Sequence, residues 1–265
     1  MRLTVIGCGT AATNPVTPAS GLLLTSGATE LLLDCGPGVI SRLGTHVNPT
    51  RLSAIVVSHL HFDHYLDLVA LRYLLPWRGR RSNRPIVYLP PGGLAHLVAL
   101  EVAMSERAGF FAAALDVVEY DPDQSIHLHD ELAVSFSPSQ HYVPSWSVAI
   151  EGPRGERVVY TGDTGPTEAL VDLSRGADLA IVEASLAAAD EDDPVRGHLT
   201  VDEAIGIVER SGARGGLIVH YPWERRAQIA ARAARARALV RVAVPDLVID
   251  IASGTAGGVT LGAAG

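Results

Sequence analysis

The sequence predicts an α/β fold in which two similar halves form one sandwich. Short apolar, β-branched runs alternate with segments of helical pattern, and the order of strands followed by helices occurs twice. Hydrophobic residues make up 48% of the 265-residue chain, which is enough for a sizeable core. No linker, low-complexity segment or short-period repeat is visible, so we expect a single domain over residues 1–265.

The first half of the chain is expected to begin as an antiparallel meander, with a turn at Ser26-Gly27-Ala28. Gly7-Cys8-Gly9-Thr10 is glycine-rich, but prolines and no helix follow it, so a phosphate-binding fingerprint is not expected. The strands predicted in this half are residues 3–7, 21–25, 30–34, 54–57 and 86–89, and the helices are residues 65–75 and 93–105.

The second half is expected to contain a hairpin around Gly152-Pro153-Arg154-Gly155. Thr200 and Glu203 predict a capping box at the start of a helix. The acidic loop of residues 190–194 is assigned no function. The predicted strands are residues 117–120, 132–136, 148–151, 157–161, 179–182, 217–219, 247–251 and 258–261, and two further helices cover residues 167–174 and 224–240.

Charge and cysteine content narrow the class of protein. The formal net charge of -8 and the pI of about 5.6 do not suit nonspecific wrapping of nucleic acid, although they allow a local basic pocket. Cys8 and Cys35 lie in apolar, strand-like surroundings and are expected to be reduced core thiols. Neither a signal-peptide pattern nor an apolar run long enough for a bilayer is visible, so we expect a cytoplasmic protein without membrane contact.

Three histidines and one aspartate lie within six residues, directly after a buried strand. Residues two apart at a strand end point the same way, so His59 and His61 can converge on one point. Asp63 and His64 follow the bend and can converge on a second point nearby. Imidazole and carboxylate are the usual nitrogen and oxygen ligands of zinc-like ions. A histidine-rich surface turn is the alternative, and it is disfavoured because similar residues end later strands.

These later residues are His141, Asp163 and His220, each placed just past a predicted strand. Asp163 lies in the run Thr161-Gly162-Asp163-Thr164. Asp34 also ends a strand, and it could accept a hydrogen bond from a metal-binding histidine or act as a turn or capping residue. Both roles for Asp34 remain open at this stage.

Together, these motifs are similar to those of the metallo-β-lactamase superfamily. They occur in the expected order from the first strand to His220, so the resemblance covers nearly the whole chain. It implies a four-layer αβ/βα sandwich with the site at one edge. By resemblance, the first of two divalent metal ions is held by His59, His61 and His141, the second is held by Asp63, His64 and His220, and both are bridged by Asp163.

The implied chemistry is hydrolysis. Two neighbouring dications acidify a shared water, so a bridging hydroxide exists at neutral pH. Asp63 is expected to orient this hydroxide in addition to binding metal. Zinc is the default metal, with Mn or Fe as alternatives. Aspartate rather than cysteine at position 163 resembles the phosphodiesterase, lactonase and glyoxalase branches, not the true β-lactamases.

His198 distinguishes between these branches. Gly197-His198-Leu199-Thr200 resembles the Gly-His-Ser-Thr motif of ribonuclease Z and related phosphodiesterases, in which the histidine assists at the scissile phosphate. Such an imidazole could contact a phosphoryl oxygen or protonate the leaving group, so His198 is a candidate catalytic residue. A capping or surface histidine is the alternative. Glu183, which ends a predicted strand, is a candidate to orient it.

One feature of ribonuclease Z is missing from this sequence. That family inserts a long, basic arm for gripping tRNA between the third-motif histidine and the bridging aspartate. Here only a hairpin separates His141 from Asp163. The chain therefore resembles compact, armless phosphodiesterases, including enzymes that open 3′,5′-cyclic nucleotides. Pro18-Ala19-Ser20-Gly21 and Glu183-Ala184-Ser185 are similar to that bacterial group.

The sequence thus favours a dinuclear metal-dependent phosphodiesterase acting on a small nucleotide, cyclic or similar, or on a related diester. The alternatives are a ribonuclease Z-like tRNA 3′-processing endonuclease, a lactone or thioester hydrolase, and a noncatalytic metal-binding scaffold. The expected partner is a small-molecule phosphodiester, with RNA less favoured. A homodimer is expected only from the resemblance.

Substrate binding has four weaker candidates. Arg78, Arg80 and Arg81 lie on a loop that should flank the site, where an electropositive rim would attract a phosphorylated substrate. A solvated loop is the alternative explanation for this charge run. Tyr221, which follows His220, is the fourth candidate.

Overall fold

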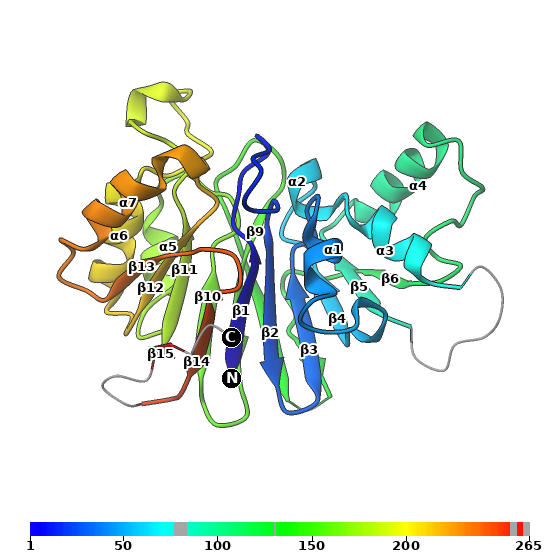
Figure 1. Ribbon diagram of the computed structural model, residues 1–265, viewed down its shortest axis with the longest axis horizontal. Helices are drawn as coiled ribbons and strands as arrows, with labels where there is room; N and C mark the ends of the chain where they lie inside the picture. The colour runs from blue at the N-terminus through cyan, green and yellow to red at the C-terminus, as the bar shows by residue number, and fades with distance from the viewer. Residues whose placement is uncertain (77–83, 130, 255–258, 262–265) are drawn as a thin grey trace.

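Two β-sheets stack face to face in this computed structural model, and helices cover the outer face of each sheet (Figure 1). The structure describes residues 1–76, 84–129, 131–254 and 259–261. The layers are those of the predicted αβ/βα sandwich, which confirms the predicted fold class. That residues 1–265 form one domain stays a prediction.

The first sheet has eight strands in the described part of the chain, in the order β15-β14-β1-β2-β3-β4-β5-β6. Strands β1, β2 and β3 form the predicted antiparallel meander, and the strands from β3 to β6 are parallel. The bounds are β1 Arg2–Gly7, β2 Gly21–Ser26, β3 Thr29–Leu33, β4 Ala54–Val56, β5 Ile86–Leu89, β6 Asp116–Glu119, β14 Val248–Ile251 and β15 Val259–Leu261.

The second sheet has seven strands among the described residues, in the order β13-β12-β11-β10-β9-β8-β7. The strands from β10 to β13 are parallel, so their carboxyl ends meet at one edge. The bounds are β7 Ile126–Leu128, β8 Leu132–Pro138, β9 Trp146–Glu151, β10 Arg157–Tyr160, β11 Leu179–Glu183, β12 Gly216–Val219 and β13 Val240–Val242.

The helices divide between the two outer faces. In Figure 1, α1, α3 and α4 lie beside the first sheet, and α5 to α7 lie beside the second. The helices are α1 Val39–Leu43, α2 Phe62–Tyr65, α3 Leu68–Leu74, α4 Gly93–Ala103, α5 Glu168–Leu173, α6 Val201–Ser211 and α7 Arg226–Ala233, and the short 3-10 turns are η1 Pro49–Arg51, η2 Ala189–Glu191 and η3 Trp223–Arg225.

The central strands β2, β3 and β4 of the first sheet carry nearly continuous apolar runs because both of their faces are covered. In β2, Leu22 and Leu24 point into the core between the sheets, whereas Leu23 points toward the core under the helices. Cys8 and Cys35 are buried and free, as predicted. Among the described residues, no helix has the length and apolar character needed to cross a membrane.

Two predicted helices differ from the structure. The helix expected over residues 65–75 is divided into α2 and α3, and the one expected over residues 224–240 ends at Ala233. Val240 instead begins β13 and lies opposite Gly216 in the parallel ladder with β12. Pairing with a neighbouring strand thus overrides the helical pattern at the end of this segment.

Candidate metal centre

The histidine-rich motif lies where the two sheets meet. It follows β4 and runs into α2, which lies at the upper edge of the molecule in Figure 1. His59 forms an isolated β-bridge with Ser145, and the amide of Trp146 donates a hydrogen bond to the carbonyl of Ser58 at 3.2 Å. The loop after β4 is therefore fixed against the start of β9, in the other sheet.

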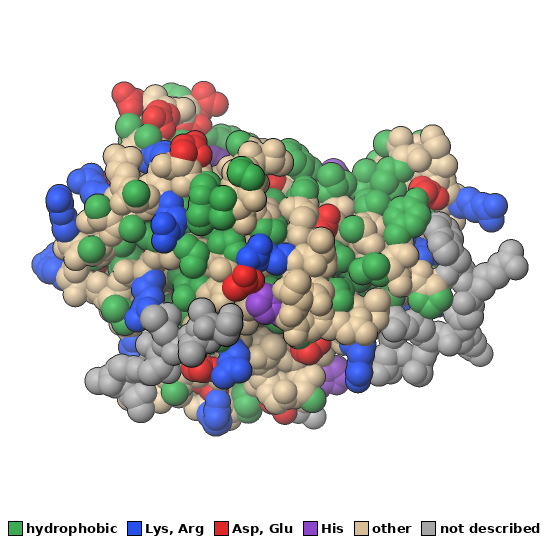
Figure 2. Space-filling model, viewed as in Figure 1, with side chains coloured by type: hydrophobic (Ala, Val, Ile, Leu, Met, Phe, Trp, Pro, Cys, Tyr) green, Lys and Arg blue, Asp and Glu red, His purple; other side chains and the backbone are tan. Residues whose placement is uncertain are grey.

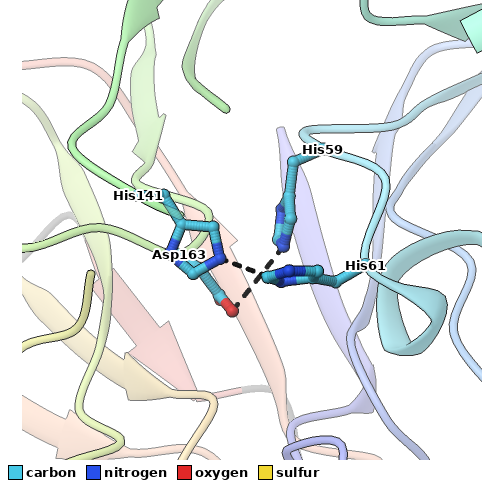
Figure 3. A group of neighbouring side chains, drawn as sticks. All are labelled: His59, His61, His141 and Asp163. Carbon is cyan, nitrogen blue, oxygen red and sulfur yellow. Dashed lines mark hydrogen bonds and ion pairs between the residues drawn. The ribbon is translucent and has the colours of Figure 1, made fainter. Parts of the chain in front are cut away.

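Four candidate ligands converge on one point (Figure 3). The ligand atoms of His59, His61, His141 and Asp163 all lie within 4.8 Å of one another. Nε2 of His59 is 3.8 Å from Oδ2 of Asp163, and Nε2 of His141 is 2.9 Å from Nδ1 of His61. The structure thus brings together the residues that the resemblance assigned to the first ion.

A second group lies beside the first and shares Asp163 with it. Ligand atoms of Asp63, His64, Asp163 and His220 also lie within 4.8 Å of one another. Nε2 of His64 is 3.3 Å from Oδ2 of Asp163, and Nε2 of His220 is 3.1 Å from Oδ2 of Asp63. The shared aspartate occupies the place expected of a bridging carboxylate.

Most of these imidazoles are oriented by the ring nitrogen that faces away from the centre. This nitrogen donates to a protein oxygen, which fixes the tautomer and leaves Nε2 as an electron-pair donor toward the centre. The contacts are Nδ1 of His59 with Oγ of Ser58 at 3.0 Å, of His64 with Oδ2 of Asp34 at 2.7 Å, and of His141 with the carbonyl of Gly197 at 2.8 Å. His220 differs, because its Nδ1 lies 2.8 Å from Oγ of Ser185 and also 3.3 Å from Oδ1 of Asp163.

Asp34 is the buried anion behind the second group, with no exposed surface. Besides His64, its carboxylate accepts hydrogen bonds from the amide of Ser58 at 2.7 Å, the hydroxyl of Ser58 at 2.9 Å and the hydroxyl of Tyr160 at 2.7 Å. Its backbone has a φ of 59°, an uncommon left-handed conformation for a non-glycine residue. Of the two roles left open for Asp34, the orienting one is present.

Unpaired buried atoms show that the site fits a divalent cation. Within the described chain, Nε2 of His59, Nε2 of His64 and Oδ1 of Asp163 are buried without a hydrogen-bond partner. Leaving such atoms unpaired is costly, and buried groups of this kind are usually satisfied. Imidazole nitrogen and carboxylate oxygen would be satisfied by Zn²⁺, and also by Mn or Fe.

The ionisable groups of the centre shift one another's pKa in opposite directions. Burial and the neighbouring His64 hold the pKa of His59 well below its usual range. Burial would lower the pKa of His64 as well, but the carboxylates of Asp163 and Asp34 raise it well above that range. Burial would raise the pKa of Asp163, yet His220 and His64 hold it well below. Asp163 is therefore a carboxylate at any physiological pH.

His198 lies beside the two groups and is held by Glu183. Nδ1 of His198 is 2.7 Å from Oε1 of Glu183, a carboxylate with no exposed surface. Glu183 also accepts from the amides of Thr164 at 3.1 Å and Ser185 at 2.9 Å. Burial would lower the pKa of His198, but the hydrogen bond and charge of Glu183 raise it to about 9. His198 is thus an imidazolium at neutral pH, and the orienting role expected for Glu183 is present.

A cavity of 430 Å³ gives access to this centre. Asp63 and His198, the two predicted catalytic residues, both line it. So does Phe62, which the sequence analysis did not single out. The cavity is lined by Thr10, Ala11, His61, Phe62, Asp63, Asp163, Ser185, His198, His220 and Pro222.

A family described as "Beta-lactamase superfamily domain" matches residues 29–221 of this chain. The chain belongs to the metallo-β-lactamase superfamily. An uncharacterized protein of Mycobacterium tuberculosis is 32% identical over 241 residues, covering 88% of this chain and 85% of the relative. The probable metallo-hydrolase YhfI of Bacillus subtilis is 30% identical over 227 residues, with 84% and 87% covered.

A solved structure and a further sequence relative agree with this assignment to the superfamily. The crystal structure of YhfI superimposes with a TM-score of 0.80 at 26% identity, covering 93% of this chain and 98% of that one. A ribonuclease Z of Ignicoccus hospitalis is 27% identical in sequence, with 83% and 87% of the two chains covered. Family and neighbours together indicate a metal-dependent hydrolase.

Tyr221, which was predicted to bind substrate, is buried in the core. Tyr221 has no exposed surface, and its hydroxyl donates to the carbonyl of Ala243. The prediction that Tyr221 contacts substrate was therefore wrong, because its side chain points into the core while that of His220 points to the centre. The arginines Arg78, Arg80 and Arg81 lie outside the described residues.

Phe62 lines the cavity without having been predicted to, and Ser185, noted only as part of Glu183-Ala184-Ser185, also contacts His220. Phe62 is 48% exposed although it lies between two candidate ligands in the chain. A large apolar residue inside a polar motif was the available signal for it. Ser185 gave no such signal, because its contact with His220 depends on the neighbouring strands β11 and β12.

Proposed function

We propose that this protein is a phosphodiesterase that hydrolyses a small nucleotide, cyclic or similar, or a related diester, with two divalent metal ions at the centre. The observation that carries this proposal is the pair His198 and Glu183 at the edge of the cavity. A relative named ribonuclease Z, 27% identical over 268 residues, supports phosphodiester chemistry. Zinc is the proposed metal.

Bound in the two ligand groups, such ions would supply a nucleophilic hydroxide at neutral pH and would neutralise charge on the phosphate. The protein's own residues position the reactants. Asp63 lines the cavity and its Oδ2 lies 3.1 Å from His220, so one carboxylate oxygen is held while the other can orient the nucleophile. Asp163 belongs to both ligand groups, so its negative charge would offset part of the repulsion between two bound cations.

His198 is proposed as the general acid. Its Nδ1 is engaged by Glu183, which leaves Nε2–H to donate to a phosphoryl oxygen or to the leaving oxygen. A pKa of about 9 keeps this proton in place at neutral pH. An alkoxide that leaves from a phosphodiester needs such a proton.

Two other reactions remain as alternatives at the same centre. In tRNA 3′ processing, the substrate would need a grip other than an arm, because only β9, β10 and their connections lie between His141 and Asp163. In lactone or thioester hydrolysis, the metals would polarise a carbonyl and His198 would be dispensable. A noncatalytic scaffold is disfavoured by the complete ligand groups.

The test offers metal-loaded protein bis(p-nitrophenyl) phosphate, cyclic AMP, a precursor tRNA and a homoserine lactone in parallel. We expect turnover of cyclic AMP, whose leaving group is an alkoxide, to fall by about 100-fold or more in His198→Ala, since general acids contribute ~10²–10⁴-fold. Bis(p-nitrophenyl) phosphate loses a stable phenolate and is expected to be affected less. Metal content is measured on the same preparations and is expected to be unchanged. Fast lactone cleavage that is indifferent to His198→Ala would reject the phosphodiesterase, and cleavage of precursor tRNA alone would favour the endonuclease.

A homodimer and a small phosphodiester partner belong to the same proposal. Sedimentation of the purified protein reports the oligomeric state directly. A monomer that is fully active would remove the dimer from the proposal and leave the chemistry intact.

A further inference from the structure

A second cavity lies beside the metal centre. Its volume is 580 Å³, compared with 430 Å³ for the cavity that holds the candidate ligands. Thr10, Ala11 and Phe62 line both cavities. Since the two share these residues, they lie side by side on either side of Phe62, within reach of one ligand that spans both.

Uncharged polar groups face this second cavity. The hydroxyls of Thr10, Thr13 and Ser41 form no hydrogen bond with another described residue. Oδ1 of Asn14 accepts from the amides of Val16 and Thr17, both at 3.0 Å, which leaves the side-chain NH₂ of Asn14 for a ligand. The cavity therefore offers hydroxyl and amide groups that suit a ligand with the same kind of groups.

The charged residues of the second cavity neutralise each other. Nε of Arg42 donates to Oδ1 of Asp246 at 3.1 Å, and its terminal nitrogen contacts Oδ2 of the same carboxylate. Nε2 of His46 also contacts Asp246, at 2.7 Å. Arg42 and Asp246 are the charged residues among those lining the cavity in the described chain. No cation is left over for a second phosphate, so the cavity suits an uncharged portion of the substrate.

Phe62 supplies an aromatic surface at the boundary between the cavities. It is 48% exposed, although α2 places its neighbours His61 and Asp63 in the centre. An exposed aromatic ring beside a phosphodiester site is suited to stacking on a nucleobase. The exposed ring of Phe62, the hydroxyls without a partner among the described residues and the paired charges of the cavity all suit the same ligand.

We propose that the second cavity binds the nucleoside portion of the substrate, with the ring of Phe62 stacked on the base. This inference rests on the proposed phosphodiesterase function and names the group that selects the substrate. It predicts that affinity and turnover depend on an uncharged sugar and base placed on the Phe62 side of the phosphate.

Two esters with the same leaving group test the inference. Thymidine 5′-(p-nitrophenyl phosphate) carries a nucleoside, whereas methyl p-nitrophenyl phosphate does not. Because p-nitrophenolate leaves in both reactions, the ratio of their kcat/KM values isolates the contribution of the nucleoside. We expect the holoenzyme to prefer the thymidine ester by about tenfold or more, as base stacking alone would provide.

Two variants fill the cavity from opposite sides. Ser41→Trp does so from α1 and Thr13→Trp from the loop after β1, and both positions are exposed. We expect the kcat/KM ratio to fall toward one in both variants. Ala99→Trp, an exposed position on α4 outside both cavities, is the matched control and is expected to keep the ratio.

Calorimetry gives a readout that does not depend on turnover. Binding of thymidine 5′-monophosphate, compared with inorganic phosphate, is expected to weaken in Ser41→Trp and Thr13→Trp but not in Ala99→Trp. A wild-type ratio near one, or a ratio and binding unchanged in both cavity variants, overturns the inference. If no diester is turned over at all, the proposed function fails, whereas the calorimetric comparison still decides the nucleoside site.

Discussion

Glu183 fixes the position and the charge of His198 at the same time. Its carboxylate accepts from two backbone amides and from Nδ1 of His198, and it has no exposed surface. A hydrogen bond to an ionised partner in such a dry position is about twice as strong as a neutral one. Of the carboxylates that raise the pKa of His198, Glu183 therefore has the largest effect, ahead of Asp163 and Asp192.

Glu183→Gln removes this charge and keeps one side-chain oxygen, which can accept from one of the two backbone amides, because the amides of Thr164 and Ser185 bond to different oxygens of Glu183. We expect kcat for a diester to fall by about 10-fold or more at pH 8, in the range of general acid catalysis. Because Glu183 causes the raised pKa of about 9, its loss lowers the pKa of His198, and the alkaline limb of the kcat profile moves to lower pH. An unchanged pH profile with reduced kcat would mean that Glu183 has only a structural role.

At this scale, the sequence could predict the ligand residues but not all of their surroundings. His59 and His61 follow from their spacing at a strand end, because side-chain direction alternates there, whereas Asp63 and His64 follow the bend and lie in α2. Tyr221 was misplaced because His220 has a φ of 46°, and no local pattern shows which way the chain turns after such a residue.

The segment that contains η2 connects β11 with the loop before α6. Figure 2 shows acidic side chains gathered at the upper left, where Figure 1 places this segment. Asp192 accepts hydrogen bonds from the amide of Gly197 at 3.2 Å and from the hydroxyl of Tyr142. The carbonyl of Gly197 in turn accepts from His141. The acidic loop, which was assigned no function, thus supports a candidate ligand through the backbone of one residue, Gly197.

Asp192→Ala should weaken metal binding. The amide of Gly197 loses its partner, so the backbone of Gly197 and the carbonyl that contacts His141 are held less firmly, and changes of this kind cost about 10-fold or more in metal affinity. Competition with a chelating indicator measures the dissociation constant of the ion. Asp190→Ala is the matched control, because Asp190 is exposed in the same loop and is expected to leave the affinity unchanged. Equal affinities in the two variants would contradict the role of Asp192.

Helix ends show how far local signals reach. The capping box of Thr200 and Glu203 was predicted and is confirmed, because both of its hydrogen bonds lie within one helical turn. The predicted end of α7 was wrong by several residues, because the sequence remains compatible with a helix up to strand β13. Short strands such as β7 were not predicted at all, since Ile126–Leu128 pair mainly with one neighbour.

The two sheets are joined at the opposite end of the molecule from α2 by a buried ion pair. The amino group of Met1 donates to Oε1 of Glu156 at 2.9 Å, and neither side chain is exposed. Met1 precedes β1 in the first sheet, and Glu156 precedes β10 in the second. Although burial would raise its pKa, hydrogen bonds from the Met1 amino group and Arg154 lower the pKa of Glu156 to about 2.

Glu156→Gln is expected to destabilise the fold by about 3 kcal/mol, as is typical when one partner of a buried pair is removed. The stability from a carboxylate with a lowered pKa is complete above the ordinary value of 4.5 and disappears as pH falls toward about 2. The difference between wild type and variant in urea unfolding should therefore shrink over this range. Glu151→Gln, an exposed carboxylate paired with Arg157, is the control, with an expected effect below about 1 kcal/mol.

The layered architecture could be predicted because strand and helix patterns alternate twice and the motifs appear in family order. The pairing of the sheets could not be worked out from the residues alone, since contacts such as Met1 with Glu156 join segments 155 positions apart. Long-range pairing of this kind leaves no mark in a local window of sequence.

Asp163 accepts contacts from histidines of both halves, and its two ligand groups draw on loops from each sheet. An ion bound there would cross-link the halves at the edge opposite the Met1 amino group. The free energy of its binding would add to the free energy of unfolding. Removal of the ion by a chelator would then loosen the sandwich at the metal centre, while the ion pair of Met1 and Glu156 still joined the sheets at the opposite edge. The supply of ions in the cell would set the lifetime of the protein against proteases as well as its activity.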